Sequence, residues 1–329
     1  MWFKSYRKRQ NAAHGKRMIC AMYIRPQTLG WLAAGMTVTI WTSFIVIARA
    51  SATLNLNPLD IVFVRIVGAG VVLLPWMLIS NHYKAQTERS FFGLSPLPWK
   101  TTVITGVLGS VLYASLAYNG FFFAPAAHAS VLLPGSLPLW TAVLAVTILK
   151  EHVSRSRGIG LACILCGGLL VGGESLLQAF DGGHVWKGDL LFMCASFCYS
   201  SYGIVVRSKG LDPINATVAL TVFSVMTFLP IYGVLAWTGL VASNLATTPI
   251  SEMAFQALFQ GGLSVVVAGI SFNVMIRTFG PIRTTMLTAL VPGLSALGAV
   301  VFLGEPLFLN LILGLTLVTT GILIGARKA

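Results

Sequence analysis

The chain is poor in charge, and acidic residues are the scarcest of its charged groups. Only 9% of the 329 residues are charged, nine of them Asp or Glu, whereas 56% are hydrophobic and the mean hydropathy is +0.83. This is far too little charge to cover a soluble globule of this length. The composition therefore predicts an integral membrane protein with the lipid bilayer as its solvent.

Cysteine is also scarce, with five residues in the chain. Cys163 and Cys166 lie in one apolar run, and Cys194 and Cys198 lie one helical turn apart in another. No pair of CxxC motifs lies in a soluble context, so the spacing favours small packing residues over redox or metal chemistry. We therefore expect no metal site and no cofactor.

The net charge of +13 is unevenly distributed. Seven of the 22 basic residues fall in the first 25 positions, and most others flank apolar runs, as the cytoplasmic anchors of membrane proteins do. This distribution argues against a nucleic-acid partner.

Residues 1–28 are interrupted by charges throughout, so they lack the apolar core of a cleavable signal peptide and are predicted to form a basic cytoplasmic tail.

Ten apolar runs follow, each long enough at about 1.5 Å per residue to cross a hydrocarbon core of roughly 30 Å. If the N-terminus is cytoplasmic, 19 of the 22 basic residues lie on the inner side, two lie outside and Arg65 lies within a span. The sequence thus predicts an all-α membrane fold with both termini cytoplasmic. The predicted transmembrane helices are 29–49, 58–79, 102–122, 125–149, 157–173, 188–208, 214–238, 254–277, 281–303 and 307–326.

One pattern occurs twice. A proline inside an apolar run precedes a glutamate by thirteen residues in both 138–151 and 292–305, and the same offset of 154 aligns Gly160 with Gly314. Matches at offsets of 155 to 158 extend the duplication over both halves, so five runs fall in each copy. Because five is odd, the copies must cross the membrane in opposite senses, as two inverted-topology repeats. The predicted divisions are a first repeat at 29–173, an extracytoplasmic connection at 174–187 and a second repeat at 188–329.

These features resemble the EamA-type transporters of the drug/metabolite transporter superfamily. The resemblance rests on ten spans in two inverted halves, each with a proline-containing apolar helix, a Leu-x-Glu at 149–151 or 303–305, and a glycine-rich last helix. The first copy departs from the pattern, because Lys150 stands where the second copy has Gly304. The resemblance implies export or exchange of a small metabolite, often an amino acid.

Pro138 and Pro292 are candidates for the substrate cavity. A proline inside a helix leaves the carbonyl four residues earlier without its donor, which here means those of Pro134 and Thr288. Both prolines are expected near the midplane, where repeat transporters keep their sites. The alternative is a kink that only shapes packing.

Arg65 is predicted about 10 Å inside the second span. An arginine there costs at least 2.5–3.5 kcal/mol, so it should face the bundle or a wet cavity, either as a structural anchor or as a residue that attracts anionic groups.

Trp41 aligns with Tyr199, and Phe44 with Tyr202, at an offset of 158. These rings are candidates for apolar cavity walls with hydroxyl groups as polar contacts, although packing is the commoner role.

Three uncharged polar residues, Asn119, His128 and Asn273, lie in or at the predicted spans. Each is more often an interhelical hydrogen-bonding group than a ligand-binding one. Glu151 and Glu305 end their helices at opposite interfaces, where a structural bond to the next helix or to nearby backbone is favoured over gating.

No acidic residue is predicted near the midplane of a span, whereas strongly ion-coupled transporters usually need one. The function indicated is therefore facilitated export or exchange of a small polar, amino-acid-like metabolite across the inner (plasma) membrane by alternating access. The alternative is an integral-membrane enzyme acting on lipid or a lipid-linked substrate. That alternative would need a cluster of catalytic groups at one membrane face, and the five histidines are scattered.

Overall fold

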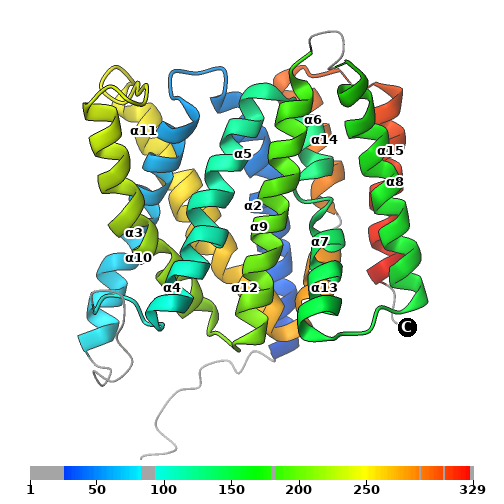
Figure 1. The fold of residues 1–329 in the computed structure, drawn as a ribbon, viewed down its shortest axis with the longest axis horizontal. Coiled ribbons are helices and arrows are strands. Elements are labelled where there is room, and N and C mark those ends of the chain that lie inside the picture. Colours follow the sequence, from blue (N-terminus) through cyan, green and yellow to red (C-terminus); the bar gives the residue numbers. More distant parts are fainter. Residues whose placement is uncertain (1–25, 83–92, 179–182, 289, 307, 327–329) are drawn as a thin grey trace, which may run out of the picture.

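A computed structural model describes residues 26–82, 93–178, 183–288, 290–306 and 308–326 as one bundle of helices (Figure 1). Most of the predicted basic tail, residues 1–25, lies outside this part of the chain, as do 179–182 of the predicted connection. The first described helix begins at Pro26, because proline is well accommodated in the first turn of a helix.

The helices of the first repeat follow the predicted runs closely. The third run is one helix with a π segment in its middle, and the fourth is broken into two α-helices. The elements are α2 (Pro26–Ser51), α3 (Pro58–His82), α4 (Trp99–Gly106), η2 (Val107–Val111), α5 (Leu112–Phe123), α6 (Ala126–Leu132), α7 (Leu137–Leu144), η3 (Ala145–Leu149) and α8 (Arg155–Gln178).

The second repeat has the same order of spans, but its fourth span lacks a counterpart of η3. Its third span again contains a π segment, and its fourth span is again broken. The elements are α9 (Val185–Ser208), α10 (Pro213–Trp237), α11 (Ile250–Gln256), η5 (Ala257–Val267), α12 (Ala268–Phe279), α13 (Pro281–Leu287), α14 (Leu290–Leu303) and α15 (Leu309–Ala326).

Length and composition agree with a membrane fold. Within the described residues, eight helical segments are long and apolar enough to cross a bilayer, and Leu309–Gly325 is a shorter apolar helix. With α8, which covers the predicted run 157–173, these segments account for the ten predicted spans. Most of the helices extend one to five residues beyond the apolar runs, since helix geometry continues into the polar interface.

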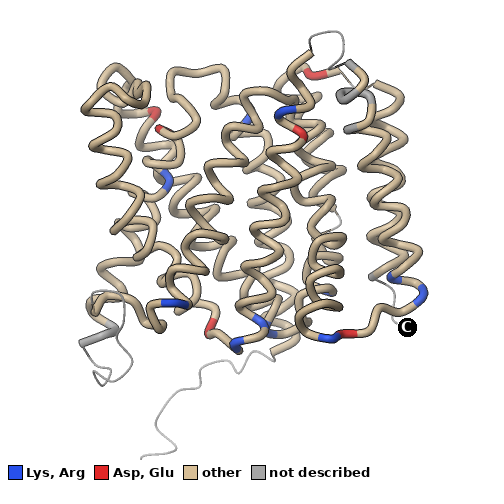
Figure 2. Tube along the Cα trace, viewed as in Figure 1, with Lys and Arg blue, Asp and Glu red and all other residues tan. Residues whose placement is uncertain are grey.

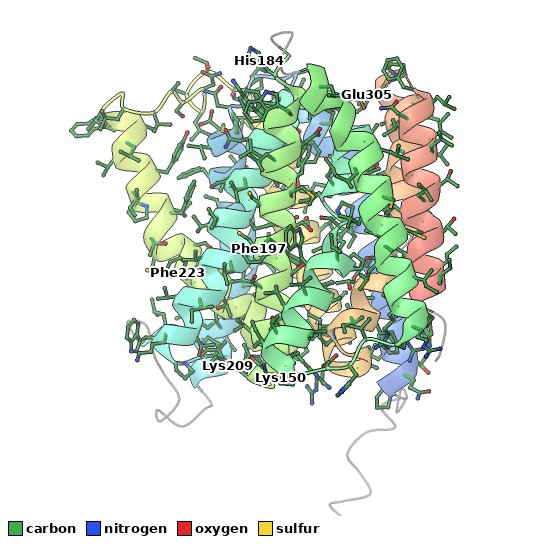
Figure 3. The ribbon with its side chains drawn as sticks, turned by 45° about the vertical axis from the view of Figure 1, so that its right-hand side comes forward. Lys150, His184, Phe197, Lys209, Phe223 and Glu305 are labelled. Atoms are coloured by element: carbon green, nitrogen blue, oxygen red, sulfur yellow. The ribbon has the colours of Figure 1, made fainter. Side chains whose placement is uncertain are left out.

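The two repeats run in opposite directions. Figure 1 shows α2 beginning and α15 finishing at the same end of the bundle. Figure 3 labels Lys150 and Lys209 at this end, and His184 and Glu305 at the other. We call them the Lys150 end and the Glu305 end. Most of the described Lys and Arg residues gather at the Lys150 end (Figure 2).

The last helices of the two repeats, α8 and α15, pack against each other through the duplicated glycines. A Cβ atom on Gly160 would lie 2.3 Å from the Gly321 carbonyl oxygen, and one on Gly167 would lie 2.6 Å from that of Gly314. The helices can approach this closely only because these positions carry no side chain. The pair thus joins the repeats along one side of the bundle.

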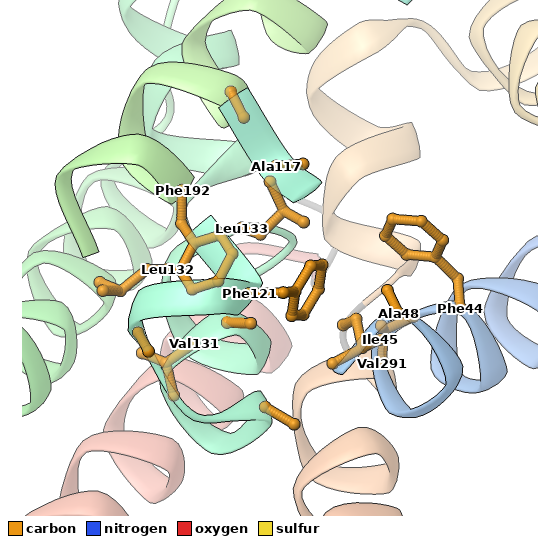
Figure 4. Close-up of a cluster of buried hydrophobic side chains, with 14 of the residues drawn as sticks. Phe44, Ile45, Ala48, Ala117, Phe121, Val131, Leu132, Leu133, Phe192 and Val291 are labelled. Atoms are coloured by element: carbon orange, nitrogen blue, oxygen red, sulfur yellow. The ribbon is translucent and has the colours of Figure 1, made fainter. Parts of the chain in front are cut away.

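An aromatic layer fills the core towards the Glu305 end. The ring of Phe121 lies 6.0 Å from that of Phe44 and 5.0 Å from that of Phe192, measured between centroids, so rings from α2, α5 and α9 are in contact (Figure 4). All three side chains are buried. This layer lies directly beside the cavity described below, because Phe44 contributes to both.

Candidate functional site

A small cavity of about 30 Å³ lies inside the bundle, and both repeats contribute to its walls. This volume is room for about two water molecules. Eleven residues line it: Trp41, Phe44, Ile45, Arg65, Tyr113, Leu133, Pro134, Leu137, Ser196, Tyr199 and Ser264. Sites between inverted repeats, beside a broken helix, are typical of secondary transporters.

Arg65 is the charged residue of this lining. It extends from α3, is 5% exposed, and donates from Nη1 to the hydroxyls of Tyr118 at 3.3 Å and Ser264 at 3.4 Å. Its Nε has no hydrogen-bond partner. No carboxylate pairs with it in the described part of the chain, whose ion pairs involve other residues.

Aromatic rings surround the Arg65 guanidinium in place of a counter-ion. Its central carbon lies 5.7 Å from the ring centroid of Phe44, 6.0 Å from that of Tyr113 and 5.9 Å from that of Tyr118. Cation–π contacts of this kind contribute about 0.5–2 kcal/mol each. These contacts offset part of the free-energy cost of burying a charge in the membrane. They leave the Nε–H donor of Arg65 without a partner.

Trp41 and Tyr199, aligned in the sequence, meet in the structure and both line the cavity. Their ring centroids are 5.7 Å apart, and Tyr199 lies 4.8 Å from Tyr113 on α5. The aligned pair at the next position does not share this role. Phe44 lines the cavity, whereas the Tyr202 hydroxyl accepts a hydrogen bond from Asn273 at 2.7 Å, and Tyr202 is not among the lining residues.

The structure corrects one expectation about the two prolines, that they leave backbone carbonyls without a hydrogen bond. Pro138 and Pro292 lie in the first turns of α7 and α14, after the breaks in the fourth spans, and neither is a lining residue. The expectation of free carbonyls is wrong, because Pro134 accepts from the Leu137 N–H at 3.3 Å and Thr288 from the Val291 N–H at 3.0 Å. The break itself reaches the cavity through Leu133, Pro134 and Leu137.

The three polar candidates differ in their contacts. Asn273 donates to Tyr202 and to Thr217 at 3.2 Å, so it joins α12 to α9 and α10. Asn119 donates to the carbonyl of Ser115, four residues earlier, so the expected bond to another helix is wrong for this residue. None of the three polar candidates lines the cavity.

His128 meets an acidic residue that the sequence argument had assigned to a connection or helix end. Its Nδ1 lies 3.0 Å from Oδ1 of Asp189, and the Asp189 side chain is 7% exposed. This contact joins α6 to α9. Asp189 was overlooked because it lies only four residues after the start of its helix. At such a position the sequence alone does not distinguish a buried carboxylate from a solvated one.

Glu305 joins the two repeats at its end of the bundle. Its Oε1 accepts from Arg49 Nε at 3.0 Å and from the Ala126 N–H at 3.2 Å, and its Oε2 accepts from the Ala127 N–H at 3.3 Å. Arg49 also donates to the Phe121 carbonyl at 2.6 Å. A carboxylate is stabilised here because the first N–H groups of α6 have no intrahelical partner. We call these five residues the Glu305 cluster.

Glu151, the repeat equivalent of Glu305, makes no such contacts. Its backbone N–H bonds the Ala145 carbonyl at 3.1 Å, as that of Glu305 bonds Ala299 at 3.3 Å, so the local backbone is alike. Among the described residues, however, its side chain has no hydrogen bond or ion pair. Arg207, the equivalent of Arg49, is exposed.

Among the contacts of Arg65, three residues escaped the sequence argument: Tyr113, Tyr118 and Ser264. Tyr113 and Tyr118 lie mid-span in the third run, and Arg65 in the second was already known to need a partner. Searching neighbouring spans for rings and hydroxyls at a similar depth could have found them. No group of three or more His, Cys, Asp or Glu residues that could hold a metal occurs in the described ranges.

The chain is similar to known transporter proteins. The model of the EamA-like transporter family matches residues 28–173 and again 186–326. The uncharacterized transporter YyaM of Bacillus subtilis is 24% identical over 231 residues, covering 67% of this chain and 71% of that protein. The WAT1-related protein At5g40210 of Arabidopsis thaliana is 24% identical over 312 residues, covering 89% and 86%.

One solved crystal structure has the same fold, with a TM-score of 0.60 at 17% identity over 90% of this chain and 95% of that one. At this identity the likeness shows the fold alone. The family match covers most of the chain and occurs twice, once in each inverted repeat. The chain is therefore a member of the EamA-like transporter family, as its duplicated motifs had indicated.

Proposed function

We propose that this membrane transporter exports or exchanges a small polar, amino-acid-like metabolite by alternating access of its two repeats. The cavity supports this proposal, because both repeats line it and it combines aromatic walls with a few polar groups. The transporter family and its named relatives give no support to the alternative of a membrane enzyme.

The Lys150 end is proposed to face the cytoplasm. Basic residues concentrate there (Figure 2), and positively charged connections are retained on the cytoplasmic side during insertion. Both ends of the chain would then be cytoplasmic in the inner (plasma) membrane. The Glu305 cluster would lie on the outer side.

The observation that carries alternating access is the difference between two equivalent glutamates. Glu305 binds Arg49 and the start of α6, whereas Glu151 leaves Arg207 and the start of α13 unbound. In an inverted repeat, exchanging the conformations of the two halves exchanges these states. The proposed cycle breaks the Glu305 cluster when the outer side opens and forms its Glu151 counterpart when the inner side closes.

The test measures the sidedness of the cavity. A cysteine at Ser264, in a background without the native cysteines, is labelled with a membrane-impermeant thiol reagent from either side. Glu305→Gln should raise labelling from outside severalfold, because about 1–2 kcal/mol lost from one state shifts a two-state ratio 5-fold to 30-fold. Glu151→Gln should lower it, since the opposite state is weakened.

Glu252→Gln is the matched control. Glu252 lies at the same end of the bundle and accepts from Asn55 at 2.9 Å, but it is outside the Glu305 cluster. It should leave the sidedness unchanged. Equal outside labelling in Glu305→Gln and the parent protein would refute the proposed cycle.

A further inference from the structure

Arg65 carries the one formal charge among the eleven residues that line the cavity, and that charge is positive. Its side chain is 5% exposed. Three rings and two hydroxyl groups, the latter at 3.3 and 3.4 Å, are its partners among the described residues, and none of them is negatively charged. A buried cation without a counter-ion is costly in a membrane, so an anion bound beside Arg65 would stabilise the protein.

The residues around this charge carry hydrogen-bond donors that the protein itself does not use. The Nε–H of Arg65 has no partner among the described residues. Tyr113 and Tyr199 line the cavity, and their hydroxyls form no hydrogen bond within the described part of the chain. The hydroxyl of Ser264 accepts from Arg65, which leaves its own proton to donate. A lining with several donors and no carboxylate suits a ligand that only accepts.

The size of the cavity limits what this ligand is. A volume of about 30 Å³ is room for about two water molecules. A halide ion is similar in size to one water molecule, whereas an amino acid or any other organic carboxylate of that length is several times larger. The anion that fits this arrangement of the helices is therefore monatomic.

We propose that the cavity binds a chloride ion, held by Arg65 and by the hydroxyls of Tyr113, Tyr199 and Ser264. Water is the alternative occupant at this volume, but it brings no negative charge to the guanidinium. The proposal does not rest on the proposed function, because the ion is not the transported metabolite. The two agree, since an Arg65 neutralised by chloride does not disfavour a zwitterionic, amino-acid-like metabolite.

Direct binding tests the proposal. Purified full-length protein in lipid nanodiscs is equilibrated with radiolabelled chloride at constant ionic strength, with gluconate as the replacing anion because gluconate is too large for the cavity. The wild-type protein should bind chloride saturably. Bromide should compete, and gluconate should not. Raising chloride at the expense of gluconate should also raise the melting temperature, because a ligand of the folded state stabilises it.

Substitution of Arg65 tests the charge. Arg65→Met should weaken chloride binding about 10-fold to 100-fold and remove the response of the melting temperature, because a charge-assisted contact is lost. Arg65→Lys should retain part of the affinity, since it keeps the charge without the guanidinium donors. Arg277→Met is the control, because Arg277 is exposed and pairs with Asp212 at the Lys150 end, 3.4 Å away. It should bind chloride as the wild type does.

Two tyrosines test the geometry without changing the charge. Tyr199→Phe removes a hydroxyl from the lining and should weaken chloride binding about 2-fold to 10-fold. Tyr202→Phe is the matched control. Its hydroxyl accepts from Asn273 at 2.7 Å, and Tyr202 is not a lining residue. Chloride affinity should therefore be unchanged in this variant.

The outcomes are distinct. Chloride binding that depends on Arg65 and Tyr199, but not on Arg277 or Tyr202, supports the inference. A wild-type protein that binds no chloride overturns it, and so does wild-type affinity in Arg65→Met. Because Arg65→Met removes the cost of burying a charge, it should insert and fold. Should it aggregate, the two tyrosine variants decide, and equal chloride affinities in these variants would also overturn the inference.

Discussion

Lys150 and Gly304 adopt the same left-handed backbone conformation at equivalent positions of the two repeats, with φ of 57° and 66°. Each directly precedes the glutamate of its copy. Glycine adopts this conformation without strain, whereas a side chain there crowds the backbone at a cost of roughly 1–2 kcal/mol. The repeat geometry therefore imposes on Lys150 a conformation suited to the residue that it replaces.

Lys150→Gly should consequently stabilise the protein by about 0.5–1 kcal/mol, seen as a higher melting temperature of the protein in detergent. Lys150 is exposed and no contact is lost. Lys150→Ala separates the causes, since it removes the side chain but keeps the strain and should change little. Equal stabilisation by both substitutions would attribute the effect to the lysine charge.

The contact between α8 and α15 predicts that Gly160→Ala is destabilising by about 1–3 kcal/mol, because a Cβ atom would lie 2.3 Å from the Gly321 carbonyl and force the helices apart. Gly158→Ala is the control on the same helix, where no atom lies within 4 Å of the added carbon. It should be neutral or slightly stabilising. Thermal unfolding in detergent measures both, and equal losses would contradict close packing of this pair.

Asp60 is a buried carboxylate that binds a loop rather than a cation. Its oxygens accept from Tyr232 at 2.5 Å, Ser243 at 2.7 Å, and the N–H groups of Asn244 at 2.9 Å and Asn57 at 3.0 Å. Asp60→Asn should cost about 1–3 kcal/mol, since an amide nitrogen would face donors on one side.

The same substitution at Asp212 is the control for Asp60. Asp212 caps α10 by accepting from the N–H groups of Ile214 and Asn215, both at 3.1 Å, and it is half-exposed. Asparagine caps a helix as well as aspartate does. Asp212→Asn should therefore change the melting temperature little, and a drop as large as that of Asp60→Asn would mean that charge loss in general is harmful.

The aromatic wall predicts a loss of transport without a loss of fold. Trp41→Ala removes an indole whose ring lies 5.7 Å from that of Tyr199 and 5.0 Å from that of Phe272, and it should slow transport of amino-acid-like metabolites about 5-fold to 20-fold. Trp31 lies on the same helix but is 52% exposed, so Trp31→Ala should leave transport unchanged. Uptake of labelled amino acids into inside-out membrane vesicles measures both variants, and equal rates would place the transport path elsewhere.

The ten helices and their duplication were readable from sequence because both are local properties. Apolar length determines which segments can cross a bilayer, and the positions of Pro138, Pro292 and the paired glycines recur at nearly constant offsets. Membership of the EamA-like family followed from the same motifs and is confirmed by the two family matches. The close glycine contacts of α8 and α15 needed only small residues at regular spacing.

What sequence could not provide was the rotation of each helix and the course of its breaks. Pro138 and Pro292 were expected to free carbonyls inside continuous helices, but the chain breaks before each proline and its turns bond those carbonyls. Tyr202 likewise aligns with Phe44 in the duplication, yet its hydroxyl accepts a hydrogen bond from Asn273 and its side chain does not line the cavity. An apolar run contains almost no periodicity in polarity, so it carries little information on which face meets which neighbour.

The sequence by itself determined the class, the spans, the inverted duplication and the need of Arg65 for a buried partner, because each follows from composition, spacing or the cost of a charge in lipid. Only the tertiary structure decided that three rings from two helices surround Arg65 and that Glu305 is bound while Glu151 is free. The last difference lies in conformation rather than in residue type. Under the proposed cycle, equivalent residues of the duplicated chain occupy different states because the protein would adopt one arrangement of its two halves at a time.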